Sequence, residues 1–134
     1  MKRYLFGCTL ALAVLAGPVV AQETAIQGVI SGQVTAFLAD DYTRAFDYAS
    51  PTIKNMFGTA ERFGQMVQQG YPMVHRPKDM KFLELRDVSG RLWQKVMVTD
   101  AAGALHFLDY QMIETADGWQ INAVQLLAAP QVGA

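Results

Sequence analysis

One acidic side chain, Asp109, falls where a β-strand would carry it onto an otherwise aliphatic face of a sheet. Gln94 and Gln111 flank it on the same predicted face. A carboxylate among aliphatic side chains is costly to bury unless it is paired or neutralised. Two neighbouring amides could hold the polar atom of a ligand while the aliphatic floor buries its body. These three residues therefore predict a ligand pocket, in which Asp109 is the candidate general base.

Three aromatic residues outside the predicted strands, Tyr42, Phe46 and Tyr71, are the candidates for the walls of this pocket. A structural interpretation of Asp109 stays open beside the functional one. In that alternative, Asp109 lies in solvent beyond the helices or accepts a hydrogen bond from a buried backbone group. Perturbed carboxylates of this kind are often only structural.

Other chemistry finds little support in the sequence. His75 and His106 are the only histidines, too few for a three-histidine zinc site. His106 and Asp109 are three residues apart on a predicted strand, so they point to opposite faces. No G-x-S-x-G elbow and no glycine-rich phosphate loop occurs. The sequence therefore predicts no metal site and no cofactor, and it assigns no catalytic residue beyond the candidate base.

The first half of the chain has helical periodicity. Thr24 and Gln27 fit a capping box, and apolar residues then recur at helical spacing as far as Leu38. Further N-cap residues are predicted at Asp40 or Asp41, Ser50 and Thr59. Gly58 and Gly70 end the last two of these helices. Residues 71–77 contain two prolines and predict an extended connector.

The second half predicts four strands over residues 80–88, 91–99, 104–114 and 119–127, joined by short glycine-containing turns. A two-residue turn at Ser89-Gly90 pairs Val88 with Arg91, Glu84 with Lys95 and Leu83 with Val96. A loop of two or four residues at the next turn pairs Val98 with Leu105 and Gln94 with Asp109. The prediction is an α+β fold in which helices cover one face of a four-stranded antiparallel meander.

This register assigns one aliphatic face to the helices and a mixed aromatic face to the outside. The predicted helix-facing strand residues, beside the polar trio, are Leu83, Leu85, Val96, Val98, Leu105, Phe107 and Ile113. Exposed aromatics on a broad sheet often mark an interface. A homodimer packed through the outer face is therefore expected, and the candidate contacts are Trp93, Met97, Tyr110 and Met112. The alternative is a chain segment that folds over them.

The N-terminus has the three parts of a secretory signal peptide, which are a basic start at Lys2-Arg3, an apolar run and small residues before Gln22. Cleavage after Ala21 leaves a single domain over residues 22–134, periplasmic or secreted and without a stable membrane anchor. The single cysteine, Cys8, leaves with this peptide. The formal net charge of −1 becomes −3 without Lys2 and Arg3. No basic patch remains, which argues against nucleic-acid binding.

Several sequence segments resemble a bacterial family, domain-of-unknown-function family 4864. The resemblance covers residues 25–127. Its segments include Ala49-Ser50-Pro51, Met56-Phe57-Gly58, Gly70-Tyr71-Pro72 and Asp117-Gly118-Trp119-Gln120-Ile121. That family is similar to the nuclear-transport-factor-2-like superfamily, which implies a curved, cone-like (cystatin-like) sheet wrapped on helices, with a cavity between them. The resemblance brings no activity, because fold analogy alone does not carry function.

Three hypotheses for the function remain. The first is a non-catalytic, exported binding or accessory module with a small apolar pocket. The second is a lyase or isomerase that acts on an apolar, carbonyl-bearing substrate with Asp109 as base. The third is a purely structural homodimerisation module whose cavity is filled by its own side chains.

Overall fold

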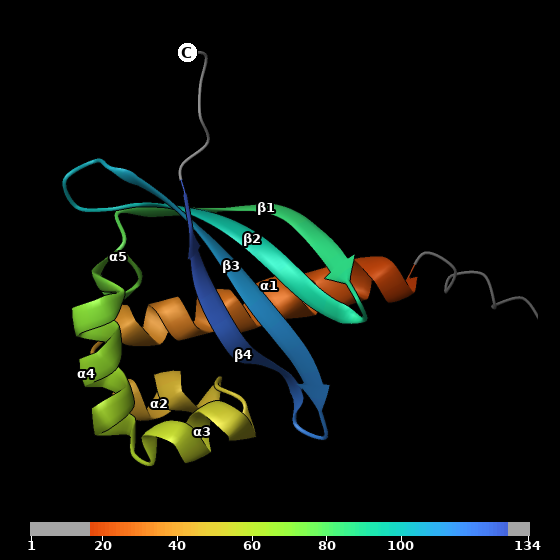
Figure 1. Cartoon of the computed structure of the whole chain (residues 1–134), viewed down its shortest axis with the longest axis horizontal. Helices are drawn as coiled ribbons and strands as arrows, with labels where there is room; N and C mark the ends of the chain where they lie inside the picture. Colours follow the sequence, from red (N-terminus) through yellow and green to blue (C-terminus); the bar gives the residue numbers. More distant parts are fainter. Residues whose placement is uncertain (1–16, 129–134) are drawn as a thin grey trace, which may run out of the picture.

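Helices precede strands along the chain in the computed structural model, which describes residues 17–128 (Figure 1). In this part of the chain the helices are α1 (Gly17–Leu38), α2 (Tyr42–Asp47), α3 (Pro51–Phe57), α4 (Ala60–Gly70) and α5 (Pro72–His75). The strands are β1 (Asp79–Val88), β2 (Arg91–Thr99), β3 (Leu105–Thr115) and β4 (Gly118–Leu127). Most of the predicted signal peptide, including Cys8, and residues 129–134 lie outside the described residues.

Three of the predicted helix starts are confirmed. The side chains of Asp41, Ser50 and Thr59 each accept a hydrogen bond from the backbone N–H three residues on, at 3.1 to 3.2 Å. Such caps satisfy one of the unpaired N–H groups at a helix start. The capping box at Thr24 is wrong, because α1 begins at Gly17 and Thr24 lies inside it.

The predicted extended connector over residues 71–77 is also wrong, because α5 forms within it. Pro72 occupies the first helical position, where its fixed φ favours a helix and its missing N–H costs nothing. The α5 helix ends before Pro77, as expected for a residue that precedes proline.

The four strands form one antiparallel sheet in the order β1-β2-β3-β4, so the predicted α+β meander is confirmed. Ser89 and Gly90 have φ values of 54° and 86° and form the two-residue turn that pairs Val88 with Arg91. A β-bulge then shifts the register, so that Val96 pairs with Phe82 instead of Leu83. The predicted Glu84–Lys95 register pair is lost to the bulge, although the side chains still approach to 3.6 Å.

The predicted register of the middle hairpin is wrong by one residue. Leu105 pairs with Thr99, and Gln94 pairs with Tyr110 instead of Asp109. The cause is an odd loop over residues 100–104, in which Asp100 Oδ1 accepts the backbone N–H groups of Ala102 and Ala104, both at 2.9 Å. An aspartate that binds the backbone beyond it in this way fixes a turn.

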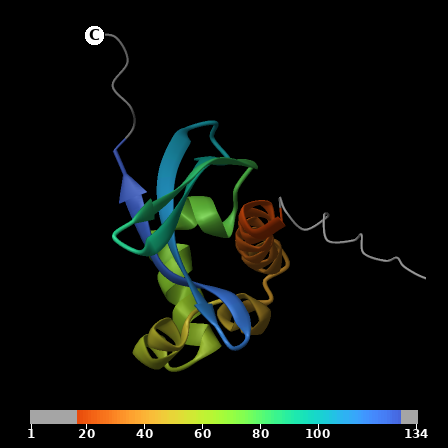
Figure 2. The same ribbon diagram turned by 90° about the vertical axis from the view of Figure 1, so that its right-hand side faces the viewer.

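The helices pack against one face of the twisted sheet (Figures 1 and 2). On β2 the predicted inward residues Val96 and Val98 are confirmed, both with at most 1% of their surface exposed. On β3 the one-residue shift turns the strand over. The apolar residues that it buries beneath the helices are Leu108, Tyr110 and Met112. The predicted inward residues Leu105 and Phe107 therefore lie on the outer face, and Leu105 is 52% exposed.

Candidate functional site

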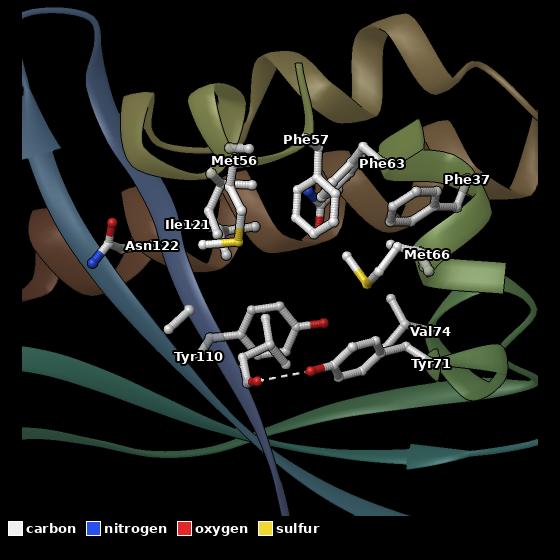
Figure 3. A pocket seen from close by; sticks show the side chains of 16 residues that line it. Phe37, Met56, Phe57, Phe63, Met66, Tyr71, Val74, Tyr110, Ile121 and Asn122 are labelled. Carbon is white, nitrogen blue, oxygen red and sulfur yellow. Dashed lines mark hydrogen bonds between the residues drawn. The ribbon is translucent and has the colours of Figure 1, made fainter. Parts of the chain in front are cut away.

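A cavity of about 300 Å³ lies between the helices and one end of the sheet (Figure 3). Helices α1, α3, α4 and α5 and strands β3 and β4 all contribute to its wall. It is called the apolar cavity here. Its lining residues are Gln33, Phe37, Ala49, Ile53, Met56, Phe57, Phe63, Met66, Val67, Tyr71, Val74, Tyr110, Ile121, Asn122, Ala123 and Val124. A volume of this size is at the lower end of the range for small-molecule sites.

Helix α3 supplies one wall of the apolar cavity and is held against β4. The backbone N–H of Ser50 donates to Ile121 O at 2.8 Å, and Ile121 N–H donates to Tyr48 O at 2.9 Å. Ser50 Oγ caps α3 and also donates to Asn122 Oδ1 at 2.8 Å. Because Ser50 joins the start of α3 to β4, the side chains of α3 and β4 face one another across the cavity.

Met56 stands at the mouth of the apolar cavity, since it lines the cavity and is still 66% exposed. Met66, on α4, is half-buried on the opposite wall. Methionine side chains are unbranched and flexible, so they adapt to irregular apolar shapes. The wall can therefore change shape around a ligand at modest cost.

The polar groups in the cavity wall already have partners, with one exception. Gln33 Nε2 donates to Ala45 O at 3.1 Å, and Tyr71 Oη donates to Val124 O at 3.1 Å. The amide of Asn122 bonds to both Ser50 and Gln111. These contacts hold the wall together and use one donor each of Gln33, Tyr71 and Asn122.

Tyr110 is the exception. Its side chain comes from β3, is 1% exposed, and its hydroxyl has no hydrogen-bond partner among the described residues. Figure 3 shows the ring crossing the cavity with the hydroxyl directed inward, toward Tyr71 and Val74. Burial, and to a smaller extent the neighbouring Tyr71, raises the pKa of Tyr110 far above its ordinary value. At neutral pH the group is therefore an uncharged phenol that can donate one hydrogen bond.

No histidine, acid, lysine or arginine lies among the described residues that line the cavity. Among the described lining residues, the two tyrosines are the only titratable groups. General acid–base catalysis near neutral pH needs a group that can exchange a proton there. The chemistry available in the wall is therefore apolar contact and hydrogen bonding.

Asp109, the predicted base, lies on the other face of the sheet. The one-residue shift of β3 places it opposite Lys95, away from the helices, and it does not line the apolar cavity. Its side chain is only 7% exposed, and it forms an ion pair with Arg86, whose side chain is 32% exposed. The two guanidinium nitrogens of Arg86 donate to the two carboxylate oxygens at 2.8 and 2.7 Å. This two-bond pair is the geometry in which arginine binds carboxylates most strongly.

A model of a known family matches residues 20–134, and its description is "Domain of unknown function (DUF4864)". The chain belongs to this family. No curated protein matches the chain. The resemblance stated from the sequence is thereby confirmed for DUF4864, while the similarity to the nuclear-transport-factor-2-like superfamily stays a prediction.

The two glutamines predicted beside Asp109 have structural partners in this DUF4864 domain. Gln94 is fully buried, and its Nε2 donates to Leu83 O at 3.0 Å and to Lys95 O at 2.9 Å. It therefore closes the β-bulge of β1. Gln111 Oε1 accepts a hydrogen bond from Asn122 Nδ2 at 2.7 Å. Neither glutamine lines the apolar cavity.

Of the three predicted aromatic wall residues, only Tyr71 lines the cavity. Phe46 packs behind the wall, with its ring 5.3 Å from that of Phe63. Tyr42 Oη lies 2.9 Å from His75 Nε2 and accepts a hydrogen bond from Gln68 Nε2 at 2.7 Å. Tyr42 thus belongs to a polar cluster beside α4 and α5.

That polar cluster includes His75 and the ion pair of Asp40 with Arg76. Arg76 donates to Asp40 Oδ1 at 2.7 Å and also to Phe37 O at 2.7 Å, so it ties α5 to the end of α1. Burial, and then the charge of Arg76, lowers the pKa of His75 below its ordinary value. His106 pairs separately with Asp100 at 2.7 Å. Within residues 17–128, no three histidine, cysteine or acidic residues are grouped to hold a metal.

The outer face differs from the predicted dimer surface. Trp93 and Met97 are half-buried on β2, opposite the buried Val96 and Val98, as predicted. Tyr110 and Met112 are each 1% exposed beneath the helices, so they cannot take part in an outer contact. Sequence reasoning missed Tyr110 as a cavity residue. The signal that could have placed it is the Asp100 and Gly103 pair, which favours an odd loop.

Proposed function

We propose that this protein is an exported, non-catalytic module that binds a small, mainly apolar ligand in the apolar cavity. The observation that carries the proposal is the cavity itself, about 300 Å³ with an almost wholly apolar wall. Since one water molecule takes up about 30 Å³ in the liquid, this volume equals that of about ten water molecules and suits a small ligand of roughly ten non-hydrogen atoms. Burial of apolar ligand surface supplies about 25 cal/mol per Å², which favours a hydrophobic compound.

Export rests on the sequence of the N-terminus and is compatible with the helix that follows. Val19 and Val20 are 70% and 60% exposed, and the first fully buried side chain of α1 is Ile26. Cleavage after Ala21 would therefore remove no core contact of these residues. Among residues 17–128, no helix is long and apolar enough to cross a bilayer.

Binding is favoured over the lyase or isomerase hypothesis. Asp109 is held in a two-bond ion pair with Arg86 on the face of the sheet away from the cavity. A general base must lie within hydrogen-bond reach of the proton that it takes. The homodimer hypothesis keeps Trp93 and Met97 as candidate contacts and is compatible with binding.

A thermal-shift screen tests the proposal. Purified residues 22–134 would be screened against small apolar compounds of roughly ten non-hydrogen atoms. A ligand at a hundred times its Kd stabilises the folded state by about 2.7 kcal/mol, which raises the Tm of a domain of this size by about 10 °C.

A blocking variant locates the binding. Ile53 lines the cavity, so the larger side chain of Ile53→Trp takes up part of the space for a ligand and should weaken binding at least tenfold. The matched control is Leu105→Trp at an exposed position on the outer face, which should bind as wild type does. Equal binding by wild type and Ile53→Trp, or no shift with any compound, would contradict the proposal.

A further inference from the structure

The Tyr110 hydroxyl suggests what kind of ligand the apolar cavity accepts. It is the single polar group of the described cavity wall that is both buried and without a partner. Buried polar groups almost always have a hydrogen-bond partner, and an exception calls for an explanation. A ligand atom is one partner that would satisfy it.

We infer that the apolar cavity selects a ligand with one neutral hydrogen-bond acceptor, such as a ketone, aldehyde or ester carbonyl, and that the Tyr110 hydroxyl donates to it. This inference rests on the proposed binding function and adds the chemical class of the ligand.

Tyr110 is the buried donor of the described cavity wall that has no partner. Tyr71 donates its only hydroxyl hydrogen to Val124 O, and Gln33 Nε2 donates one of its two N–H groups to Ala45 O. The Tyr110 hydroxyl can donate once. A carbonyl oxygen is satisfied by one donor and brings no hydrogen of its own. An alcohol or primary amide brings polar hydrogens of its own, whereas the unpaired Tyr110 hydroxyl needs only an acceptor, so a carbonyl is the simplest group that satisfies it.

The described cavity wall carries no charged side chain. A carboxylate inside the cavity would lose its water and find no lysine, arginine or histidine among the described lining residues. An unpaired buried charge is strongly disfavoured. Tyr110 could offer it only one neutral hydrogen bond. The cavity should therefore reject the anionic acid that corresponds in shape to an accepted ketone.

The Tyr110 oxygen is fully covered by neighbouring side chains. A ligand atom reaches it only if a neighbouring side chain moves. Met66, which is half-buried and lines the cavity, has the rotatable bonds for such a shift. The methyl groups of Met66 and Met56 should consequently report binding.

The test uses three probes of nearly equal shape, which are acetophenone, isopropylbenzene and benzoate. They are titrated into protein labelled with ¹³C at the methionine methyl groups, and each Kd is read from Met56 and Met66. The variant is Tyr110→Phe. Its matched control is Tyr71→Phe, which removes a hydroxyl already bonded within the wall. The Met73 and Met112 methyls, both buried, show whether each variant keeps its fold.

In wild type, acetophenone should bind more tightly than isopropylbenzene, and benzoate should bind most weakly. Tyr110→Phe should weaken acetophenone by roughly threefold to tenfold, the size expected for one neutral hydrogen bond, and leave isopropylbenzene unchanged. Tyr71→Phe should keep the preference for the ketone. If the probes bind at Met56 and Met66 but Tyr110→Phe changes acetophenone and isopropylbenzene equally, the inference is wrong and the binding function stands. If no probe perturbs these methyls, both fail.

Discussion

Replacement of Arg86 by methionine tests whether Asp109 is a structural residue. The substitution keeps an unbranched side chain and removes both hydrogen bonds to the Asp109 carboxylate, at 2.8 and 2.7 Å. Loss of one partner from a fully buried ion pair costs about 3–5 kcal/mol. Arg86 is 32% exposed and Lys95 lies opposite Asp109, so water and a second cation offset part of this cost. We expect Arg86→Met to lower the free energy of unfolding by about 2–3 kcal/mol.

The assay is equilibrium denaturation by urea, extended to a double-mutant cycle. Asp109→Leu and the double variant Arg86→Met/Asp109→Leu complete the cycle. The double variant should be more stable than Arg86→Met alone, because it leaves no unpaired carboxylate. The control is Glu84→Gln, which removes the exposed ion pair to Lys95 and should change stability by about 0.5 kcal/mol or less.

Two results would refute this reasoning. One is an Arg86→Met variant as stable as Glu84→Gln, which would mean that Asp109 is not buried beneath Arg86. The other is a ligand affinity that falls when Asp109 is changed to asparagine while the fold persists. That result would show that Asp109 takes part in ligand binding.

Three further predictions follow from other parts of the molecule. Tyr110→Phe removes a buried hydroxyl that has no partner, so the ligand-free variant should unfold at the same urea concentration as wild type or at a higher one. A decrease in the free energy of unfolding of more than about 1 kcal/mol would show that the hydroxyl has a partner. Gly64→Ala should lower the free energy of unfolding by about 1–3 kcal/mol, because its Cβ would lie 2.6 Å from the Tyr42 ring. The matched variant Gly28→Ala in α1 places its Cβ in open space, so it should raise the free energy of unfolding by up to about 1 kcal/mol in the same denaturation assay. The pKa of His75 is lowered on folding, so the unfolded chain takes up this proton first, and stability should fall as pH drops below about 6.5. The variant His75→Gln should flatten that fall in urea midpoints measured from pH 7 to pH 5, and identical pH profiles would contradict the assignment.

The architecture was readable from the sequence because local signals agree with the global fold. The capping residues Ser50-Pro51 and Gly58 mark the start and the end of α3. Ser89-Gly90 fixes a two-residue turn, in which both residues have a positive φ. The α5 helix was missed because Pro72 was interpreted as a breaker, although proline at a first helical position favours a helix.

The site was not readable, since it depends on the register of a single hairpin. A strand shows alternate residues to opposite faces, so one residue of shift moves Asp109 outward and Tyr110 inward. The hydrophobic pattern could not detect this shift, because Phe107 and Leu108 are both apolar. The signal was in the loop, where Asp100 binds two backbone N–H groups and Gly103 adopts a φ of 91°. The β1 bulge at Leu83 and Glu84 is equally invisible to a period-two pattern.

Intermolecular nuclear Overhauser effects between isopropylbenzene and the methionine methyls test the central claim most directly. They report which side chains touch a bound ligand, even when the ligand has no polar group that bonds to Tyr110. The account predicts contacts to Met56 and Met66, which line the apolar cavity, and none to Met97 on the outer face. Contacts to Met97 alone, or a saturated sample with no contact to Met56 and Met66, would contradict the account.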